Sequence, residues 1–261
     1  MIFIKSDEEI ELLRESNQIV ARALGEMAKI IEPGITTKFI DKRADEFIRD
    51  NGAIPGFLNY NGFPGSVCVS VNEVVVHGIP SDAIVLKEGD IVTVDIGAYK
   101  NGFHGDSAYT FCVGEVSPEV MNLLKTTKES LIKGVEKACE GNRVGDVGYA
   151  VQTYCEERGY TVVREMIGHG LGRKLHEDPD VPNYGRRGNG AMLRRGMVIC
   201  IEPMINSGVR NIVIEKDGWT CRTLDRKPSA HYEYAIAIRK GEADVLSGFK
   251  YVEQVLGDRF I

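Results

Sequence analysis

A spacing of 107 residues recurs along this chain of 261 residues and restricts its fold more than any other feature. The pairs that share this spacing are Gly34 and Gly141, Gly52 and Gly159, Leu86 and Leu193, Gly89 and Gly196, and Asp95 and Glu202. Chance matching of glycines is the competing interpretation. In the last pair a carboxylate residue of one repeat stands at the position equivalent to a carboxylate residue of the other, which favours duplication of one structural unit.

Each proposed repeat begins with two helices. In the first repeat, about residues 6–113, Ser6 and Glu9 form a capping box before an amphipathic helix that EPG at 32–34 ends. The segment TKFIDKRADEFIRDNG predicts a second helix with Gly52 in its C-terminal cap.

In the second repeat, about residues 117–240, Ser117-Pro118 opens a helix, and GDVGYAVQTYCEERG predicts another that stops at Gly159. Strand-like runs follow both helix pairs; in the second repeat they are VVREMIG, MVICIEPMI, RNIVIE and YEYAIAI. No linker separates the repeats. We therefore expect one α/β domain of the α+β kind over residues 1–261, with a shared core and a site between its halves.

Composition excludes several classes of protein. The chain is 43% hydrophobic, and its 32 Lys and Arg against 38 Asp and Glu give a net charge of −6, which argues against a nucleic-acid ligand. The start, MIFIKSDEEI, is neither a secretory signal nor a membrane span, so we expect a cytoplasmic location. Six scattered cysteines without a CxxC pair fit reduced thiols in the cytosol.

Two aspartates interrupt a predicted buried hairpin, VTVDIGAYKNGFHGD at 92–106. Asn101-Gly102 favours a type I′ turn, which pairs residue 100 with 103 and residue 97 with 106. Asp95 and Asp106 then lie diagonally on one face, about 7 to 8 Å apart at Cα. Burying two unpaired carboxylates is costly, so we expect a cation between them. The alternative is two solvated aspartates on an exposed sheet face.

Two further acids stand in apolar runs, Glu202 in MVICIEPMI and Glu233 in HYEYAIAI. A single acid of this kind is often part of a structural ion pair. Four buried acids repel one another unless cations hold them, so the pattern favours a centre of two divalent metal ions.

Three histidines in glycine-flanked segments are further candidates for metal binding or catalysis: His77 in VVVHGIP, His169 in GHGLG and His176 in KLHEDP. Glycine next to a histidine lets backbone or substrate approach the ring closely. Any one of these histidines could instead be a hydrogen-bonded core or surface residue without a functional role. His104 in the hairpin is expected to have only such a structural role.

The set of Asp95, Asp106, His169, Glu202 and Glu233, with GHGLG and IEPM, resembles the type I methionine aminopeptidases of peptidase family M24 over nearly the whole chain. The resemblance implies the pita-bread fold, in which two pseudo-symmetric halves with antiparallel sheets covered by helices surround a dinuclear metal site. It also implies a hydrolase that removes the initiator methionine from nascent proteins and peptides that have a small second residue.

The resemblance also implies roles for the residues. Asp95 would chelate one metal, Asp106 and Glu233 would bridge both, and His169 and Glu202 would complete the second site. The ligands suit Co, Mn, Fe(II) or Zn, and the absence of thiolates argues against a structural zinc. Glu202 would accept a proton from the attacking water, His176 would stabilise the tetrahedral intermediate, and His77 would contact the scissile amide.

A methionine pocket would form from Tyr60, Phe63, Cys68, Leu175 and Trp219, although Trp219 in DGWT could equally cap the core. Three residues depart from the family pattern: His231 stands where glutamine is common, Tyr234 where histidine is common, and Leu175 where an aromatic residue is common. His231 would either titrate near neutrality beside the metals or hydrogen-bond a bridging carboxylate. Since Ile2 is bulky, we expect Met1 to be retained.

Two other functions fit part of the pattern. Prolidases and proline-specific aminopeptidases share fold and ligands but resemble this domain with an added N-terminal domain. A pita-bread binding module would typically lack ligands that are present here. We expect a minimal, bacterial-type, monomeric enzyme that acts on N-terminal methionine peptides and nascent chains, with ribosome contact implied only by that substrate and no membrane partner.

Overall fold

Five α-helices form the outer layers of the computed structural model, which describes residues 1–261. Their bounds are α1 (Asp7–Ile30), α2 (Thr37–Asp50), α3 (Pro118–Val135), α4 (Val144–Glu156) and α5 (Lys250–Leu256), with short 3-10 turns η1 (Tyr60–Gly62) and η2 (Gly257–Arg259). The capping box at Ser6 and Glu9 is present, and Pro118 occupies the first turn of α3. The four long helices predicted from the sequence are therefore confirmed.

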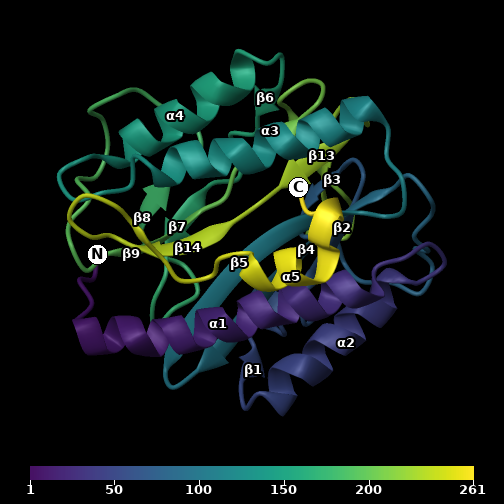
Figure 1. Ribbon diagram of the computed structural model, residues 1–261, viewed down its shortest axis with the longest axis horizontal. Coiled ribbons are helices and arrows are strands. Elements are labelled where there is room, and N and C mark those ends of the chain that lie inside the picture. Colours follow the sequence, from purple (N-terminus) through teal and green to yellow (C-terminus); the bar gives the residue numbers. More distant parts are fainter.

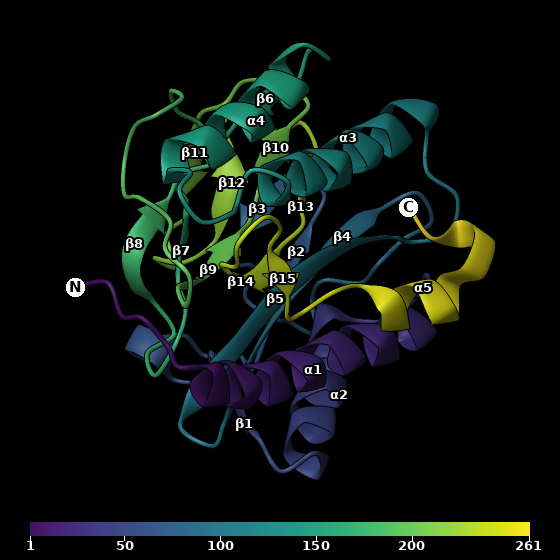
Figure 2. The same cartoon turned by 60° about the vertical axis from the view of Figure 1, so that its left-hand side comes forward.

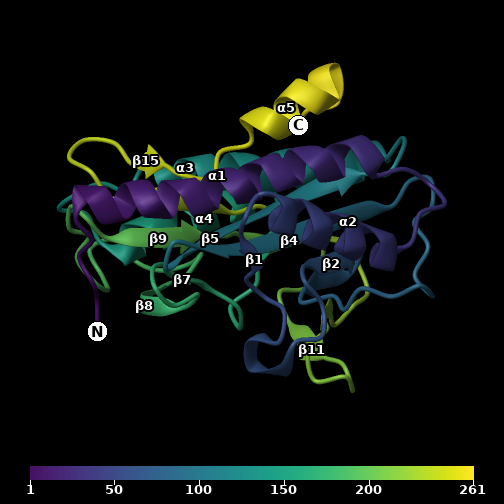
Figure 3. The same cartoon turned by 90° about the horizontal axis from the view of Figure 1, so that it is seen from below.

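The helices form two pairs on opposite sides of the strands. Figure 1 shows α1 and α2 along one side and α3 and α4 along the other, and Figure 2 shows β4 and β5 running between the pairs. Helix α5 packs outside α1, on the face away from β11 (Figure 3). No helix is both long and apolar enough to cross a bilayer.

The strands form four antiparallel sheets. In the first, β4 (Ile91–Lys100) pairs with β1 (Ile54–Pro55), β2 (Cys68–Val71) and β5 (Phe103–Cys112). The largest has the order β15 (Asp244–Val245), β14 (Tyr234–Ala237), β9 (Val198–Ile201), β7 (Gly168–Gly170), β8 (Glu177–Val181). The two smaller sheets contain β13 (Ser229–His231), β10 (Met204–Asn206) and β6 (Thr161–Val162), and β11 (Ile212–Ile214), β12 (Cys221–Thr223) and β3 (Val74–Val76).

The β4–β5 hairpin has the predicted register. Lys100 pairs with Phe103 and Gly97 with Asp106, while Asp95 lies opposite Ala108. Asn101 and Gly102 have φ of 53° and 84°, as a type I′ turn requires. Asp95 and Asp106 are therefore diagonal neighbours on one face of the sheet.

Two of the predicted strands are not continuous. MVICIEPMI divides into β9 and β10, which belong to different sheets, and the chain leaves β13 for β14 at Tyr232-Glu233. Strands β9 and β14 pair in one sheet while β10 and β13 pair in another. Glu202 and Glu233 thus lie where two neighbouring chain segments pass from sheet to sheet. VVREMIG is also not one strand, because only its ends lie in β6 and β7.

Backbone contacts recur at the spacing of 107 residues. The Gly34 N–H donates to Leu86 C=O over 2.8 Å, and the Gly141 N–H donates to Leu193 C=O over 3.0 Å. Isolated bridges join 36 to 85 and 143 to 192, and these pairs are also offset by 107 residues. The contacts support the interpretation that residues 6–113 and 117–240 are repeats, which stays a prediction.

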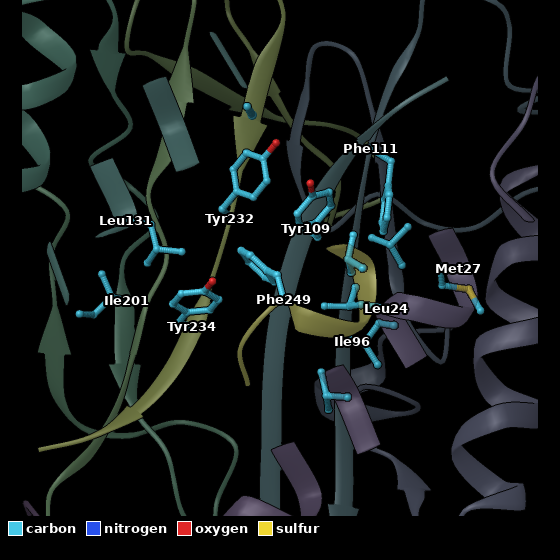
Figure 4. Packing of buried hydrophobic residues seen from close by; sticks show 14 of the residues in the cluster. Leu24, Met27, Ile96, Tyr109, Phe111, Leu131, Ile201, Tyr232, Tyr234 and Phe249 are labelled. Atoms are coloured by element: carbon cyan, nitrogen blue, oxygen red, sulfur yellow. The ribbon is translucent and has the colours of Figure 1, made fainter. Parts of the chain in front are cut away.

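One hydrophobic core joins both halves. Its largest cluster has 42 buried residues and includes side chains of α1, β4, β5, α3, β9 and β14. The Tyr109 ring of β5 lies 5.0 Å from Tyr232 and 4.9 Å from Phe249, measured between ring centroids (Figure 4). Burial of this continuous apolar surface holds the two halves in a fixed relation to each other.

Candidate metal centre

The four acids and one histidine expected to bind metal line one cavity of about 290 Å³. Asp95 comes from β4 and Asp106 from β5, both in the first half; His169 comes from β7, and Glu202 and Glu233 from the two sheet crossings. The structure thus brings together residues that are up to 138 positions apart (233 minus 95).

His169 lies among the carboxylates. Its Nε2 is 3.8 Å from Asp106 Oδ2 and 3.6 Å from Glu202 Oε1. Its Nδ1 is 2.9 Å from the Gly170 carbonyl oxygen, which can only accept a hydrogen bond, so the proton lies on Nδ1. The Nε2 lone pair therefore faces the acids, as a metal-binding histidine requires.

Glycines on both sides of His169 allow this placement. A Cβ at Gly168 would lie 2.3 Å from the Cys200 carbonyl oxygen, and one at Gly170 would lie 2.2 Å from the Asp178 carbonyl oxygen. Side chains at either position would push β7 away from β9 or β8. The GHG sequence is thus explained by the close approach of neighbouring backbones.

The backbones of the acidic residues are held by hydrogen bonds. The Asp106 N–H donates to Asn17 Oδ1 on α1 over 3.1 Å. The Glu233 N–H donates to the Ala108 carbonyl over 2.9 Å, and Ser107 Oγ donates to the Glu233 carbonyl over 2.6 Å. Glu233 is therefore fixed directly to the strand that carries Asp106.

The carboxyl groups are strongly perturbed. Burial, followed by repulsion from the neighbouring acids, raises the pKa of Asp106 and Glu233 well above their usual values. Burial raises the pKa of Asp95 to about 7 and that of Glu202 to about 8. Asp95 Oδ1, Asp106 Oδ1 and Glu233 Oε1 are buried and have no hydrogen-bond partner. Divalent cations would pair these oxygens and remove the repulsion, so the donor set fits metal ions.

The histidines around the cavity are neutral. Burial lowers the pKa of His169 to about 3 and that of His77 to about 4. His77 also has φ of 58°, a conformation that is uncommon outside glycine and marks functional positions. His104 lies outside the cavity lining and packs on Tyr99, as its structural interpretation predicted.

All the expected pocket residues line the same cavity, namely Tyr60, Phe63, Cys68, His77, Leu175, His176 and Trp219. The Trp219 ring lies 5.2 Å from Phe63 and 6.1 Å from His77, both edge to face. Tyr60 Oη is 2.7 Å from His176 Nδ1. Trp219 therefore forms part of the wall, although a core-capping residue was the alternative.

Two neighbours of the acids were not assigned as donors from the sequence. Cys200 Sγ belongs to a group with donor atoms of Asp106, His169 and Glu233 that all lie within 4.8 Å of one another. His231 is 1% exposed, with Nε2 at 3.6 Å from Glu202 Oε2. Cys200 precedes Glu202 by two residues, and His231 precedes Glu233 by two residues. Because residues two apart in a strand share a face, this spacing could have indicated from the sequence that Cys200 lies near the acids. A thiol therefore lies beside the acids, and whether it is a ligand bears on the expectation that the centre has no thiolate.

The sequence model of metallopeptidase family M24 matches residues 11–240. Methionine aminopeptidase of Clostridium acetobutylicum is 49% identical over 247 residues, which cover 95% of this chain and 99% of that protein. The chain belongs to metallopeptidase family M24, and within it to the methionine aminopeptidases.

Solved structures of M24 members agree with this assignment. Methionine aminopeptidase from Thermotoga maritima superposes with a TM-score of 0.93 at 43% identity, covering 95% of this chain and 99% of that one. Prolidase from Pyrococcus furiosus reaches 0.76 at 23% identity, and this chain covers 65% of it. The prolidase shares the fold alone, and the predicted pita-bread fold is confirmed.

Proposed function

We propose that this M24 protein is a metal-dependent methionyl aminopeptidase that removes the N-terminal methionine from peptides and nascent chains with a small second residue. The observation that carries the proposal is the meeting of four carboxyls, two of them buried, and His169 in one cavity that aromatic and apolar side chains also line. A polar centre next to an apolar pocket suits hydrolysis of a peptide bond beside an apolar side chain.

The metal ligands we propose are Asp95, Asp106, His169, Glu202 and Glu233. Four carboxylates carry four negative charges, which two divalent cations balance, so charge supports two ions. When bound, such ions supply Lewis acidity and make a water acidic enough to attack a carbonyl near neutral pH. Oxygen and imidazole donors suit Mn, Fe(II), Co or Zn.

Glu202 is the proposed proton acceptor. Burial raises the pKa of its carboxyl, and an acid with a raised pKa holds an abstracted proton more readily than a solvated one. Its two oxygens face His169 and His231. Both imidazoles are neutral, so they leave the charge of the carboxylate uncancelled.

His176 and His77 would contact the substrate at the scissile bond. If the Tyr60 hydroxyl donates to His176 Nδ1, across their 2.7 Å contact, the imidazole carries its proton on Nε2. That N–H would then donate to the oxygen of the tetrahedral intermediate. His77, held against Trp219, would contact the departing amide.

Specificity is proposed to come from Tyr60, Phe63, Cys68, Leu175 and Trp219. Aromatic rings and a thiol contact a flexible thioether favourably, and Phe63, Cys68 and Leu175 are buried in the cavity wall. The cavity of about 290 Å³ holds the acids and the apolar pocket together, and a small closed region beyond the methionine pocket is proposed. Large second residues would be rejected sterically.

The proposed setting is the cytoplasm, with a monomer that acts on chains leaving the ribosome. All six cysteines are free, and four of them are buried. Such thiols suit a reducing compartment. The charge of −6 supports a peptide substrate without direct nucleic-acid recognition.

The test is release of methionine from Met-Ala-Ser, Met-Leu-Ser and Xaa-Pro peptides by protein stripped of metal and reloaded singly with Mn, Fe(II), Co or Zn. We expect metal-restored cleavage of Met-Ala-Ser only. Asp106→Asn should abolish it, whereas Glu242→Gln, an exposed acid far from the cavity, should not. Cleavage of Xaa-Pro peptides, or none with any metal, would contradict the proposal.

A further inference from the structure

Cys200 places a sulfur atom among the acids of the centre. The residue lies in β9, two positions before Glu202, and is fully buried. Its Sγ forms one four-membered group with donor atoms of Asp106, His169 and Glu233, all within 4.8 Å of one another. Three proposed metal ligands therefore share one small space with a thiol.

We propose that Cys200 is a sulfur ligand of the centre, so that the ion on the His169 side is drawn from the thiophilic divalent metals, with Zn(II), Co(II) and Cd(II) preferred over Mn(II). The inference rests on the metal centre of the proposed function. It adds a ligand and a metal preference that oxygen and imidazole donors alone do not supply.

The four donors of this group suit binding of one ion. Bonds of roughly 2.0 to 2.3 Å place neighbouring ligands about 3.5 Å apart, so the four donors need to contract by on the order of 1 Å. Asp106 Oδ1 and Glu233 Oε1 are buried without hydrogen-bond partners, and a cation would satisfy them. With Glu202, which is also proposed as a ligand on this side, one sulfur, one nitrogen and three carboxylate oxygens would surround the ion.

The bond changes balance without a further reactant. The S–H bond of Cys200 breaks, the sulfur keeps the electron pair and forms the bond to the ion, and the proton leaves to solvent. No electron is transferred. The charge of the dication is reduced by the thiolate it gains.

Cys68 provides a matched comparison. Cys68 is buried like Cys200 and, unlike Cys200, lines the cavity, but it lies on β2 opposite Asp95 and outside the four-donor group. If any thiol near the centre could bind the ion, Cys68 and Cys200 would contribute alike. The geometry assigns the ligand to Cys200 alone.

The test follows Co(II) binding to metal-free protein by absorption, with binding itself measured by calorimetry. A thiolate-to-Co(II) charge-transfer band should appear in the wild type and in Cys68→Ser. It should be lost in Cys200→Ser and Cys200→Thr, which should still bind Co(II). Cd(II) affinity should fall by at least about tenfold in these variants, with Mn(II) affinity nearly unchanged.

A wild-type protein that binds Co(II) without this band would overturn the inference, as would a band of equal strength in Cys200→Ser. Cadmium NMR of the wild type distinguishes sulfur from oxygen ligation without any variant. Peptide cleavage is a separate readout. A charge-transfer band without cleavage of Met-Ala-Ser would contradict the proposed function and support Cys200 as a ligand. Cleavage without the band would support the proposed function and contradict Cys200 as a ligand.

Discussion

Glu202 lies between two imidazoles, and each of its oxygens faces one of them. His169 Nε2 is 3.6 Å from Oε1, and His231 Nε2 is 3.6 Å from Oε2. In the metal-free protein the carboxyl is buried with a raised pKa. In its proposed catalytic role the residue would act at the expense of stability, because an acid in this place opposes folding unless a cation is bound.

Replacing Glu202 by glutamine should separate these two effects. Loss of the proton acceptor should lower kcat on Met-Ala-Ser by roughly 10²- to 10⁴-fold. The metal-free variant should unfold at a higher temperature than metal-free wild type, because one buried acid is gone. Calorimetry and steady-state kinetics measure both, with Glu242→Gln as the control. A less stable variant would refute the electrostatic account.

His231 offers a second prediction at this scale. The expectation that it titrates near neutrality is wrong for the metal-free protein, since burial lowers its pKa to about 4. The alternative, a hydrogen bond to a bridging carboxylate, is not formed: both ring nitrogens lack partners, and Nε2 stands 3.6 Å from Glu202 Oε2. We propose that His231 donates to Glu202 once metal is bound. His231→Leu should weaken metal affinity by roughly 10- to 100-fold, whereas His231→Gln, which keeps a donor, should change it less. Equal losses in both variants, measured by calorimetry, would argue against a hydrogen bond.

At the scale of elements, α1 fixes the hairpin that carries two of the acids. Asn17 accepts a hydrogen bond from the Asp106 N–H, and Ser16 Oγ donates to the Phe103 carbonyl over 3.1 Å. Gly105 lets the two elements meet, since a Cβ there would lie 2.5 Å from the Ser16 carbonyl carbon. The position of Asp106 thus depends on how closely α1 packs on β5.

Gly105→Ala should therefore disturb the centre from outside it. Overpacking typically costs about 1 to 3 kcal/mol, and displacement of β5 should weaken metal binding as well. Gly248→Ala is the matched control, because its Cβ would meet Val245 at an ordinary 3.6 Å. Chemical denaturation and metal titration check the two effects. Unchanged stability in Gly105→Ala would contradict the packing argument.

Elements fixed by local signals were predictable from the sequence, and pairings between distant segments were not. The capping box at Ser6 and the Asn101-Gly102 turn act within a few residues, so the helix start and the hairpin register followed directly. The break of MVICIEPMI into β9 and β10 depends on partners, β14 and β13, some 30 residues away. Periodicity carries no information on such a switch between sheets.

The same distinction applies to the candidate site. Glu202 and Glu233 were conspicuous as acids in apolar runs, and the resemblance supplied their grouping with His169. Cys200 gave no such contrast, because a cysteine in an apolar strand is ordinary core composition. Only the folded chain places its sulfur beside Asp106 and Glu233.

For the whole molecule, the buried acids determine how stability depends on pH. In the metal-free protein the folded pKa of Asp95 is about 7 and that of Glu202 about 8, above the ordinary carboxyl values. Acids of this kind contribute full stability below their unfolded pKa and lose it as pH rises through the folded value. The neutral histidines act in the opposite direction, but only below about pH 6.5.

Between pH 6.5 and about 8 the acids alone should therefore determine the slope. Metal-free protein should lose roughly 1.4 kcal/mol per pH unit for each acid still protonated in the folded state. Metal-loaded protein should show a much flatter dependence, since bound cations keep the acids ionised. Thermal unfolding with chelator and with added Co(II) measures this. A Tm of the metal-free protein that rises between pH 6.5 and 8 would contradict the raised carboxyl pKa values.

The division of the ligands between the two halves also orders events during synthesis. Asp95 and Asp106 leave the ribosome well over one hundred residues before Glu233, and elongation proceeds at roughly 5 to 20 residues per second. For several seconds the hairpin therefore carries two acids with no partners from the second half to share a cation. The chain can gain the proposed centre only after Glu233 has been synthesised, so a chain that lacks this residue could not process its neighbours.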